Sequence, residues 1–241
     1  MGVLLASEVR RIFRSPRFMI FTIGFPVVYF LIFSGLYATG ADAAAVTLVL
    51  MLNMAAFGAI SASISTGGRV ATERTIGWNR QLRLTPLPGW AYLVVKAAVA
   101  MLVALPALVL TFAVAAAVKH VDLSLVDWVK VFLAAWICML PFAAIGLLVG
   151  MFATQDSAQG MATVAMLLFS LLGGIFIPAS ILPSAMATLA HALPSYWIGE
   201  IARGQAFGES VPLQGVLVLA VWLVVAGGLV ALRYRRDALR V

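Results

Sequence analysis

The sequence has 241 residues, of which 63% are hydrophobic and only 10% are charged. Soluble domains carry about 25% charged residues, so this composition excludes a soluble globular protein. The 16 Lys and Arg residues outnumber the 9 Asp and Glu residues, giving a net charge of +7, and the charges lie in short stretches between long apolar runs. This pattern is typical of a polytopic helical membrane protein, whereas a nucleic-acid-binding protein needs a continuous basic patch.

The apolar runs define the expected fold. A bilayer core of about 30 Å takes about 20 helical residues to cross. The sequence predicts an all-α chain forming a single transmembrane domain over residues 1–241, with six spans at about 18–37, 44–66, 91–118, 128–152, 158–177 and 211–232. The first run is too long for the apolar region of a secretory signal, so we expect it to be retained as a span.

The distribution of basic residues predicts the orientation. An even number of spans places both termini on the same side of the membrane, and all Lys and Arg residues except Lys119, Lys130 and Arg203 then fall on that side. Basic residues concentrate in cytoplasmic segments of membrane proteins. The sequence therefore predicts a multi-pass protein of the bacterial cell membrane with both termini in the cytoplasm.

Several kinds of chemistry are missing from the sequence. It has no GxxxxGK[ST] phosphate loop, so ATP would have to be handled by a partner. No charged residue lies near the centre of a predicted span, which argues against a proton or sodium relay. Cys138 has no second cysteine to pair with, and the only histidines, His120 and His191, fall in connections between spans. We therefore expect no catalytic site, metal or cofactor in this chain.

Small residues recur at four-residue spacing in two spans. They are Ala55, Ala59, Ser63 and Gly67 in the second span and Gly146 and Gly150 in the fourth. In lipid, helices approach each other through such small residues because the hydrophobic effect does not act between them. We expect these faces, together with the outer segment described below, to form the contact between two copies of the chain.

The second span also carries polar side chains. Asn53 must find partners if it lies in hydrocarbon, so it either makes a structural contact or lines a transport pathway. The hydroxyl of Ser61 either lines the same pathway or bonds a backbone carbonyl one turn earlier.

The segment Arg69 to Leu84 mixes arginines with apolar residues between the second and third spans. This composition predicts an amphipathic helix at the cytoplasmic membrane surface. Such a helix either anchors the chain to anionic lipid or docks onto a cytoplasmic partner. Glu73 favours docking, because an acidic residue adds nothing to a lipid anchor.

The segment after the fifth span is interrupted by helix-breaking residues but stays apolar. The breakers are Gly173, Gly174, Pro178, Pro183 and Pro194. Irregular backbone at membrane depth needs a cover of protein or a water-filled cavity. We expect this segment to dip back into the outer leaflet and cap a cavity or an interface, with a loop lying on the surface as the alternative.

Several motifs, in order along the six spans, resemble the permeases of type-2 ATP-binding-cassette (ABC) exporters, in particular the six-span drug-resistance branch. The resemblance covers nearly the whole chain. The motifs are the basic segment Glu8 to Arg17, Glu73-Arg74-x-x-Gly77 followed by Leu82, Thr85, Pro86 and Leu87, Lys96 at the start of the third span, Gly173-Gly174-x-x-x-Pro178, Pro183, and the stretch Pro194-Ser195-Tyr196 to Arg203.

The resemblance implies roles for these segments. It implies that the N-terminal segment is an interfacial elbow helix, that Arg69 to Leu84 is a coupling helix held by a groove on a separate ATPase, and that Pro178 to Arg203 forms re-entrant outer helices near the exit. The implied coupling residues are Glu73, Arg74, Gly77, Arg80, Leu82, Thr85 and Pro86. ATP and Mg would be bound by two copies of that ATPase. The chain has neither a fused ATPase nor a large extracellular domain, which disfavours macrolide-type or lipoprotein-type export.

These observations predict a permease half that pairs with a second copy or a homologous permease and exports an amphipathic, drug-like substrate. The expected substrate contacts are Asn53, Phe57, Ser61, Phe169 and Phe176. The alternatives are an exporter of lipid or cell-surface polysaccharide, an ATP-independent channel or carrier, and a membrane scaffold that transports nothing.

Overall fold

The structure is a computed structural model that describes residues 2–14, 20–77, 89–177 and 183–239. This part of the chain is helical, with no strand. Long helices form the body: α3 (Phe25–Tyr37), α4 (Ala43–Thr75), α6 (Gly89–Lys119), α7 (Leu125–Ile137), α8 (Leu140–Phe152), α9 (Gln155–Leu172) and α12 (Leu213–Leu239). Shorter elements are α1 (Gly2–Phe13), the π-helical turn η1 (Ile20–Gly24), α10 (Ser184–Ala192) and α11 (Pro194–Ala206).

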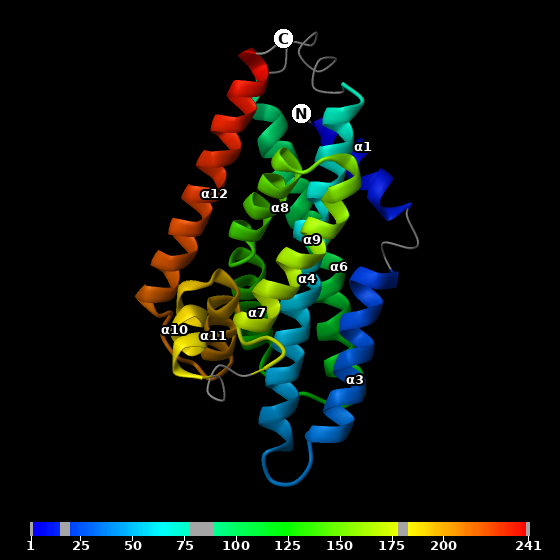
Figure 1. Ribbon diagram of the computed structural model, residues 1–241. Helices are drawn as coiled ribbons and strands as arrows, with labels where there is room; N and C mark the ends of the chain where they lie inside the picture. The colour runs from blue at the N-terminus through cyan, green and yellow to red at the C-terminus, as the bar shows by residue number, and fades with distance from the viewer. Residues whose placement is uncertain (1, 15–19, 78–88, 178–182, 240–241) are drawn as a thin grey trace.

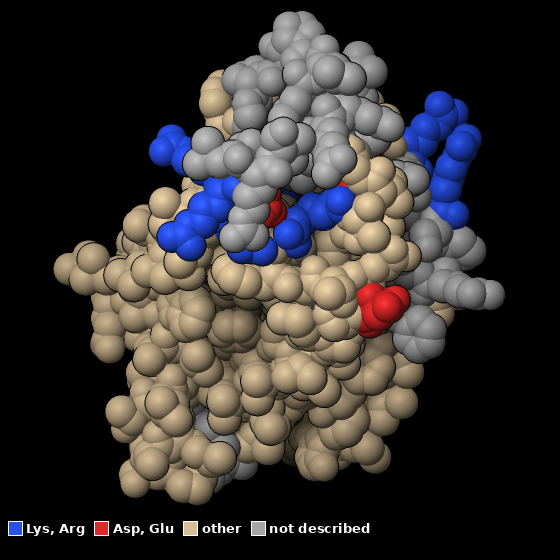
Figure 2. Space-filling view, turned by 45° about the horizontal axis from the view of Figure 1, so that its top comes forward, with Lys and Arg blue, Asp and Glu red and all other residues tan. Residues whose placement is uncertain are grey.

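The body has two distinct ends (Figure 1). We call the end that carries α1, the last turns of α12 and both termini the terminal end. The opposite end carries the turn at residues 38–42 between α3 and α4, and we call it the hairpin end; α10 and α11 lie toward it. Lys and Arg side chains gather at the terminal end, while the flank visible below them has few charged residues (Figure 2).

Helix α4 is the centre of the bundle. It packs against α3, α6, α8, α9 and α11, and its middle residues, including Met51, Met54 and Ile60, are fully buried. The outermost helix, α12, is instead apolar and largely exposed, with Val224 71% exposed. An apolar helix that is not covered by protein is explained by contact with lipid.

Four helical segments of the described chain are long and apolar enough to cross a membrane: Ala43–Thr75, Trp90–Lys119, Leu125–Phe152 and Leu213–Asp237. The apolar segment Thr22–Tyr37 is shorter, and α9 is not among the candidates. The helices therefore establish a polytopic membrane protein, and the count of six spans stays a prediction.

The structure changes three of the expected boundaries. The second span does not stop at residue 66, because α4 continues to Thr75 and takes in the first part of the expected amphipathic helix. The fourth span divides into α7 and α8 just before Pro141, whose ring has no N–H and clashes with a preceding carbonyl. The fifth helix ends at Leu172, before Gly173 and Gly174, the latter with a φ of 78°.

The small-residue faces pack within the chain. A Cβ atom on Gly67 would lie 2.1 Å from the backbone oxygen of Gly146, and one on Gly150 would lie 2.4 Å from the oxygen of Gly67. Ala55, Ala59 and Ser63 are also fully buried. The expectation that these faces join two permease copies is therefore wrong: the glycines bring α4 against α8 and the other small residues are buried within the chain, so these faces are not open to a second chain.

Candidate functional site

A buried cluster of charges lies near the terminal end, where α1, α4 and α6 meet. The Nζ of Lys96 is 2.9 Å from Oε2 of Glu8, and it also donates a hydrogen bond to Oε1 of Glu73. The hydroxyl of Tyr92 donates to the second oxygen of Glu73 at 2.8 Å. Lys96 is only 3% exposed and both carboxylates are less than 7% exposed. We call Glu8, Glu73, Tyr92 and Lys96 the buried charge cluster.

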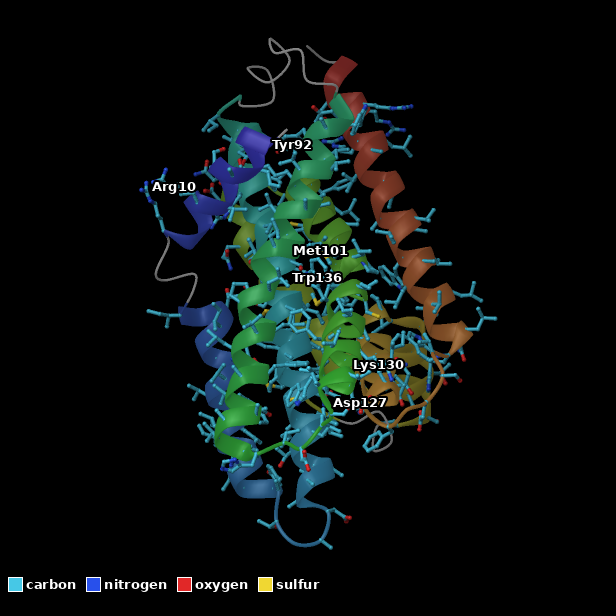
Figure 3. All side chains as sticks on the ribbon, turned by 180° about the vertical axis from the view of Figure 1, so that it is seen from behind. Arg10, Tyr92, Met101, Asp127, Lys130 and Trp136 are labelled. Atoms are coloured by element: carbon cyan, nitrogen blue, oxygen red, sulfur yellow. The ribbon has the colours of Figure 1, made fainter. Side chains whose placement is uncertain are left out.

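The local sequence explains how the cluster forms. Tyr92 and Lys96 are four residues apart on α6, so they lie on one face of that helix. Glu8 and Glu73 are brought to that face by α1 and by the last two turns of α4. Tyr92 also stacks on Tyr234 of α12, with ring centroids 5.7 Å apart. Figure 3 shows Tyr92 beside α1 at this end of the body. Side chains from four helices are thus joined at one place.

Arg74, the neighbour of Glu73, joins the same end of α4 to two further elements. One guanidinium nitrogen donates to the carbonyl oxygens of Met151 at 2.6 Å and Gly150 at 3.2 Å, in the last turn of α8. The other nitrogen donates to Asp237 of α12 at 3.0 Å. The last carbonyls of a helix lack intrahelical partners and carry partial negative charge, so a guanidinium is a suitable cap.

Gly77 ends this region of α4. Its φ of +75° is in the left-handed region, and its N–H bonds to the carbonyl of Arg74 at 3.3 Å. Glycine adopts this conformation without steric cost and commonly follows the last residue of a helix. The chain therefore turns away from the α4 axis at Gly77. The other expected coupling residues, Arg80, Leu82, Thr85 and Pro86, lie outside the described residues, as does the rest of the expected amphipathic helix.

The side chains of Glu73 and Arg74 lie in a different environment from the one that the sequence predicted. Both were expected as docking contacts on an amphipathic helix at the membrane surface. Glu73 is instead 5% exposed with both oxygens bonded, and Arg74 faces α8 and α12. In this structure their side chains hold the end of α4 in the bundle rather than presenting it to solvent.

A second candidate site is a cavity of about 660 Å³ between η1, the start of α3, α4 and α9. Phe57, Ser61 and Phe176, three of the five expected substrate contacts, line it together. Its other walls include Phe25 and Met166, with hydroxyls from Thr22, Ser65 and Thr163. The lining is mostly apolar with a few polar groups, and its volume is in the range of small-molecule sites.

The other two expected contacts lie elsewhere. Asn53 is buried, and a Cβ atom on Gly199 of α11 would lie 3.5 Å from its amide oxygen. Phe169 packs edge-on against Phe142 and Trp222, on the side facing α8 and α12. Neither residue lines the cavity that holds Phe57.

The segment after α9 forms two short helices that return to the body. Pro183 precedes α10 and Pro194 is the first residue of α11, positions where the missing proline N–H costs little. Gly173 lies against Ser195, so close that a Cβ atom would be 2.0 Å from its hydroxyl oxygen. Trp197 and Ile198 bury α11 against the bundle. Pro178 lies outside the described residues.

Sequence reasoning missed the contacts that surround Glu73 and Arg74, two of the expected coupling residues. Glu8 and Lys96 were noted only as parts of motifs, and Tyr92 and Asp237 were given no role. One signal was present: Glu8 and Glu73 are isolated acids in basic segments, and Lys96 lies inside an apolar helix. Among the described residues, no group of three His, Cys, Asp or Glu side chains could hold a metal ion.

The fold and the charge distribution define a multi-pass helical membrane protein whose basic residues and buried ion pairs are concentrated at one end. Comparison with known proteins agrees with this class. The profile of the ABC-2 type transporter family matches residues 1–207, so the chain belongs to that family and is a transmembrane transporter subunit. A Bacillus subtilis (strain 168) protein named as a transport permease, YvfS, is 28% identical over 220 residues, covering 90% of each chain.

Proposed function

We propose that this chain is the six-span permease half of an ATP-driven exporter, working with a second permease chain and two copies of a separate ABC ATPase that binds ATP and Mg. The terminal end faces the cytoplasm in this proposal, in line with the concentration of Lys and Arg there. α1 is the interfacial helix, and the segment that follows Gly77 is the contact with the ATPase.

The observation that carries the proposal is the pair of linkages at the end of α4. Glu73 joins α4 to α6 and, through Lys96, to α1, while Arg74 joins it to α8 and α12. Any displacement of the chain beyond Gly77 reaches these helices together, because the bonded side chains are buried or half-buried. Nucleotide-driven movement at the membrane surface would then be passed to the spans as a rigid-body shift.

The cavity lined by Phe57, Ser61 and Phe176 is the proposed substrate site. Its aromatic walls and scattered hydroxyls suit an amphipathic, drug-like molecule that enters from the cytoplasm or the inner leaflet. A polysaccharide would need a more polar lining. A lipid exporter and an ATP-independent channel or carrier remain outcomes of the test below.

The test uses inside-out vesicles containing the permease and the ATPase that co-purifies with it from native membranes. Uptake of a fluorescent amphipathic cation, ethidium, is measured with ATP, without ATP, and with the permease alone. We expect uptake only when ATPase and ATP are both present. Uptake by the permease alone would refute the proposal, and ATP-driven movement of a labelled phospholipid without ethidium uptake would make the substrate a lipid.

The linkage itself is tested with Arg74→Gln, which removes the charge that caps α8. We expect ATP-driven uptake to fall by about tenfold or more, since hydrogen bonds to a charged group contribute about 1.5–3 kcal/mol. The control is Arg235→Gln, which makes the same substitution at an exposed position on α12. Equal uptake by the two variants would contradict a coupling role for Arg74.

A further inference from the structure

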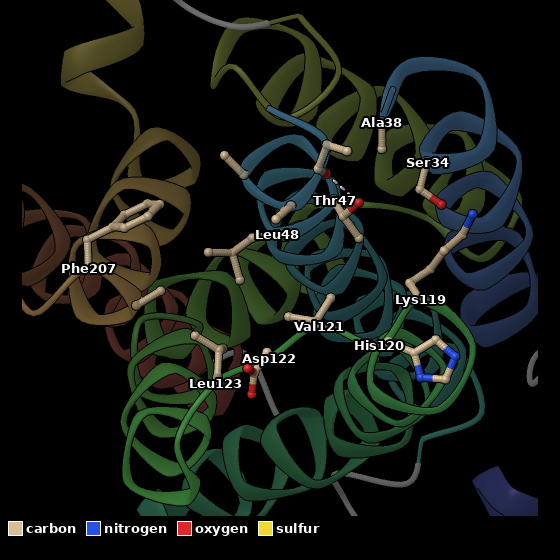
Figure 4. A pocket seen from close by; sticks show the side chains of 14 residues that line it. Ser34, Ala38, Thr47, Leu48, Lys119, His120, Val121, Asp122, Leu123 and Phe207 are labelled. Carbon is tan, nitrogen blue, oxygen red and sulfur yellow. Dashed lines mark hydrogen bonds between the residues drawn. The ribbon is translucent and has the colours of Figure 1, made fainter. Parts of the chain in front are cut away.

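A cavity of about 720 Å³ opens at the hairpin end, away from the proposed coupling and substrate sites (Figure 4). Its walls come from the end of α3, the start of α4, the end of α6 with the turn after it, and the end of α11. This volume is within the range of sites that bind small molecules or headgroups.

Two opposite charges line this cavity without being paired to each other. Among the described residues, three basic side chains lie away from the terminal end, and two of them have acidic partners: Lys130 with Asp127, and Arg203 with Glu200. The third, Lys119, lines the cavity and forms no ion pair with any residue that the structure describes. Asp122 lines the same cavity and, within the described chain, is also without an ion pair.

The two charges face different parts of the cavity. In Figure 4, Lys119 and His120 lie on one side of Val121, while Asp122 lies on the other. His120 has a φ of 50°, an uncommon conformation for a residue with a side chain. A ligand spanning the cavity would therefore meet an ammonium and an imidazole at one end and a carboxylate at the other.

The position of the cavity indicates its depth in the membrane. Lys119 is the last residue of the spanning segment that begins at Trp90, and the next spanning segment begins at Leu125. The cavity therefore lies where the hydrocarbon ends and the headgroup layer begins. Its apolar lining, provided by Leu48, Leu123 and Phe207, adjoins that boundary.

We propose that this cavity binds a zwitterionic phosphoethanolamine headgroup of a membrane lipid. The phosphate pairs with Lys119 and accepts a hydrogen bond from His120, the primary ammonium donates to Asp122, and the glycerol backbone lies on the apolar lining. A purely anionic headgroup would be repelled by Asp122, and a purely cationic one by Lys119. A quaternary ammonium cannot donate hydrogen bonds to the carboxylate, so choline lipids should bind less tightly.

The proposal is tested by titrating the purified permease in detergent with dihexanoylphosphatidylethanolamine and following binding by calorimetry. Dihexanoylphosphatidylglycerol serves as the anionic comparison. We expect the zwitterionic lipid to bind about tenfold more tightly than the anionic one, and Lys119→Met and Asp122→Asn each to weaken its binding by about tenfold or more. The control pair is Lys130→Met and Asp127→Asn, which removes charges outside this cavity and should leave binding unchanged.

Equal affinity for the two lipids, or unchanged binding by the Lys119 and Asp122 variants, would overturn the proposal. Glycerophosphoethanolamine, the same headgroup without acyl chains, separates the two sources of the ligand: if it binds as tightly as the lipid, the site recognises a soluble zwitterion and the lipid assignment is wrong. If the single variants do not fold, the exchanged variant Lys119→Asp with Asp122→Lys must keep the preference for the zwitterion, since both charges are retained.

Discussion

Lys96 provides the most direct test of the buried charge cluster. It is the only cation between Glu8 and Glu73 among the described residues, and it is 3% exposed. Replacing it with Met leaves two buried carboxylates without a counter-charge. Breaking a buried ion pair in this way costs about 3–5 kcal/mol, because the remaining charge stays desolvated. For a chain of this size, about 2–4 °C of Tm per kcal/mol gives a fall of roughly 6–20 °C.

The comparison variant is Glu73→Gln. It leaves Lys96 paired with Glu8, so no buried charge loses its partner, and the amide oxygen still accepts from Tyr92. We expect a loss of about 1 kcal/mol, or roughly 2–4 °C in Tm. The assay is thermal unfolding in detergent followed by tryptophan fluorescence, with Lys130→Met as a surface control that should not shift the Tm. If Lys96→Met and Glu73→Gln lowered the Tm equally, desolvated charge would not be the cause.

Two further predictions concern glycines of α4. Gly67→Ala should prevent α4 from packing on α8 and abolish the folded yield, because the new Cβ would lie 2.1 Å from a backbone oxygen. The control is the neighbouring Gly68→Ala, where no atom lies within 4 Å of the new Cβ. This variant should raise stability by about 0.5–1 kcal/mol. Monodisperse yield and Tm measure both, and a stable Gly67→Ala protein would contradict the close contact. Gly77→Leu should cost about 1–2 kcal/mol at a φ of +75°, while Gly77→Asn, which tolerates this conformation, should cost less. A Tm series at this position distinguishes backbone strain, which Asn relieves, from an effect of adding any side chain, which would lower the Tm of both variants alike.

Prediction from the sequence succeeded where hydropathy dominates. The boundaries of the third span, expected at 91–118, differ little from Gly89–Lys119, because a run of apolar residues has no alternative to a helix in lipid. Prediction was less accurate where a single proline or glycine decides whether a helix ends or continues. Pro141 divides the fourth span, and the chain passes Gly67 and Gly68 in helical form because Gly67 is packed on α8.

For the candidate site, the sequence likewise predicted some features and missed others. Motifs pointed to Glu73, Arg74 and Gly77, and the structure places all three at the end of α4. Their contacts could not be predicted, because Asp237, which pairs with Arg74, and Glu8, which shares Lys96 with Glu73, lie near opposite ends of the chain. Hydropathy patterns describe segments one at a time and carry no information about which helices are neighbours.

The sequence by itself determined that this is a helical membrane protein with its basic residues concentrated in a few segments, because the cost of burying charge in lipid acts on each segment separately. The tertiary structure decided that Glu73 and Arg74 are internal ties, that the small-residue faces of α4 and α8 meet within one chain, and that Lys119 and Asp122 share a cavity. The physical reason is that an ion pair, a close backbone contact or a cavity exists only when distant segments are brought within a few ångströms, and helix packing alone sets those distances.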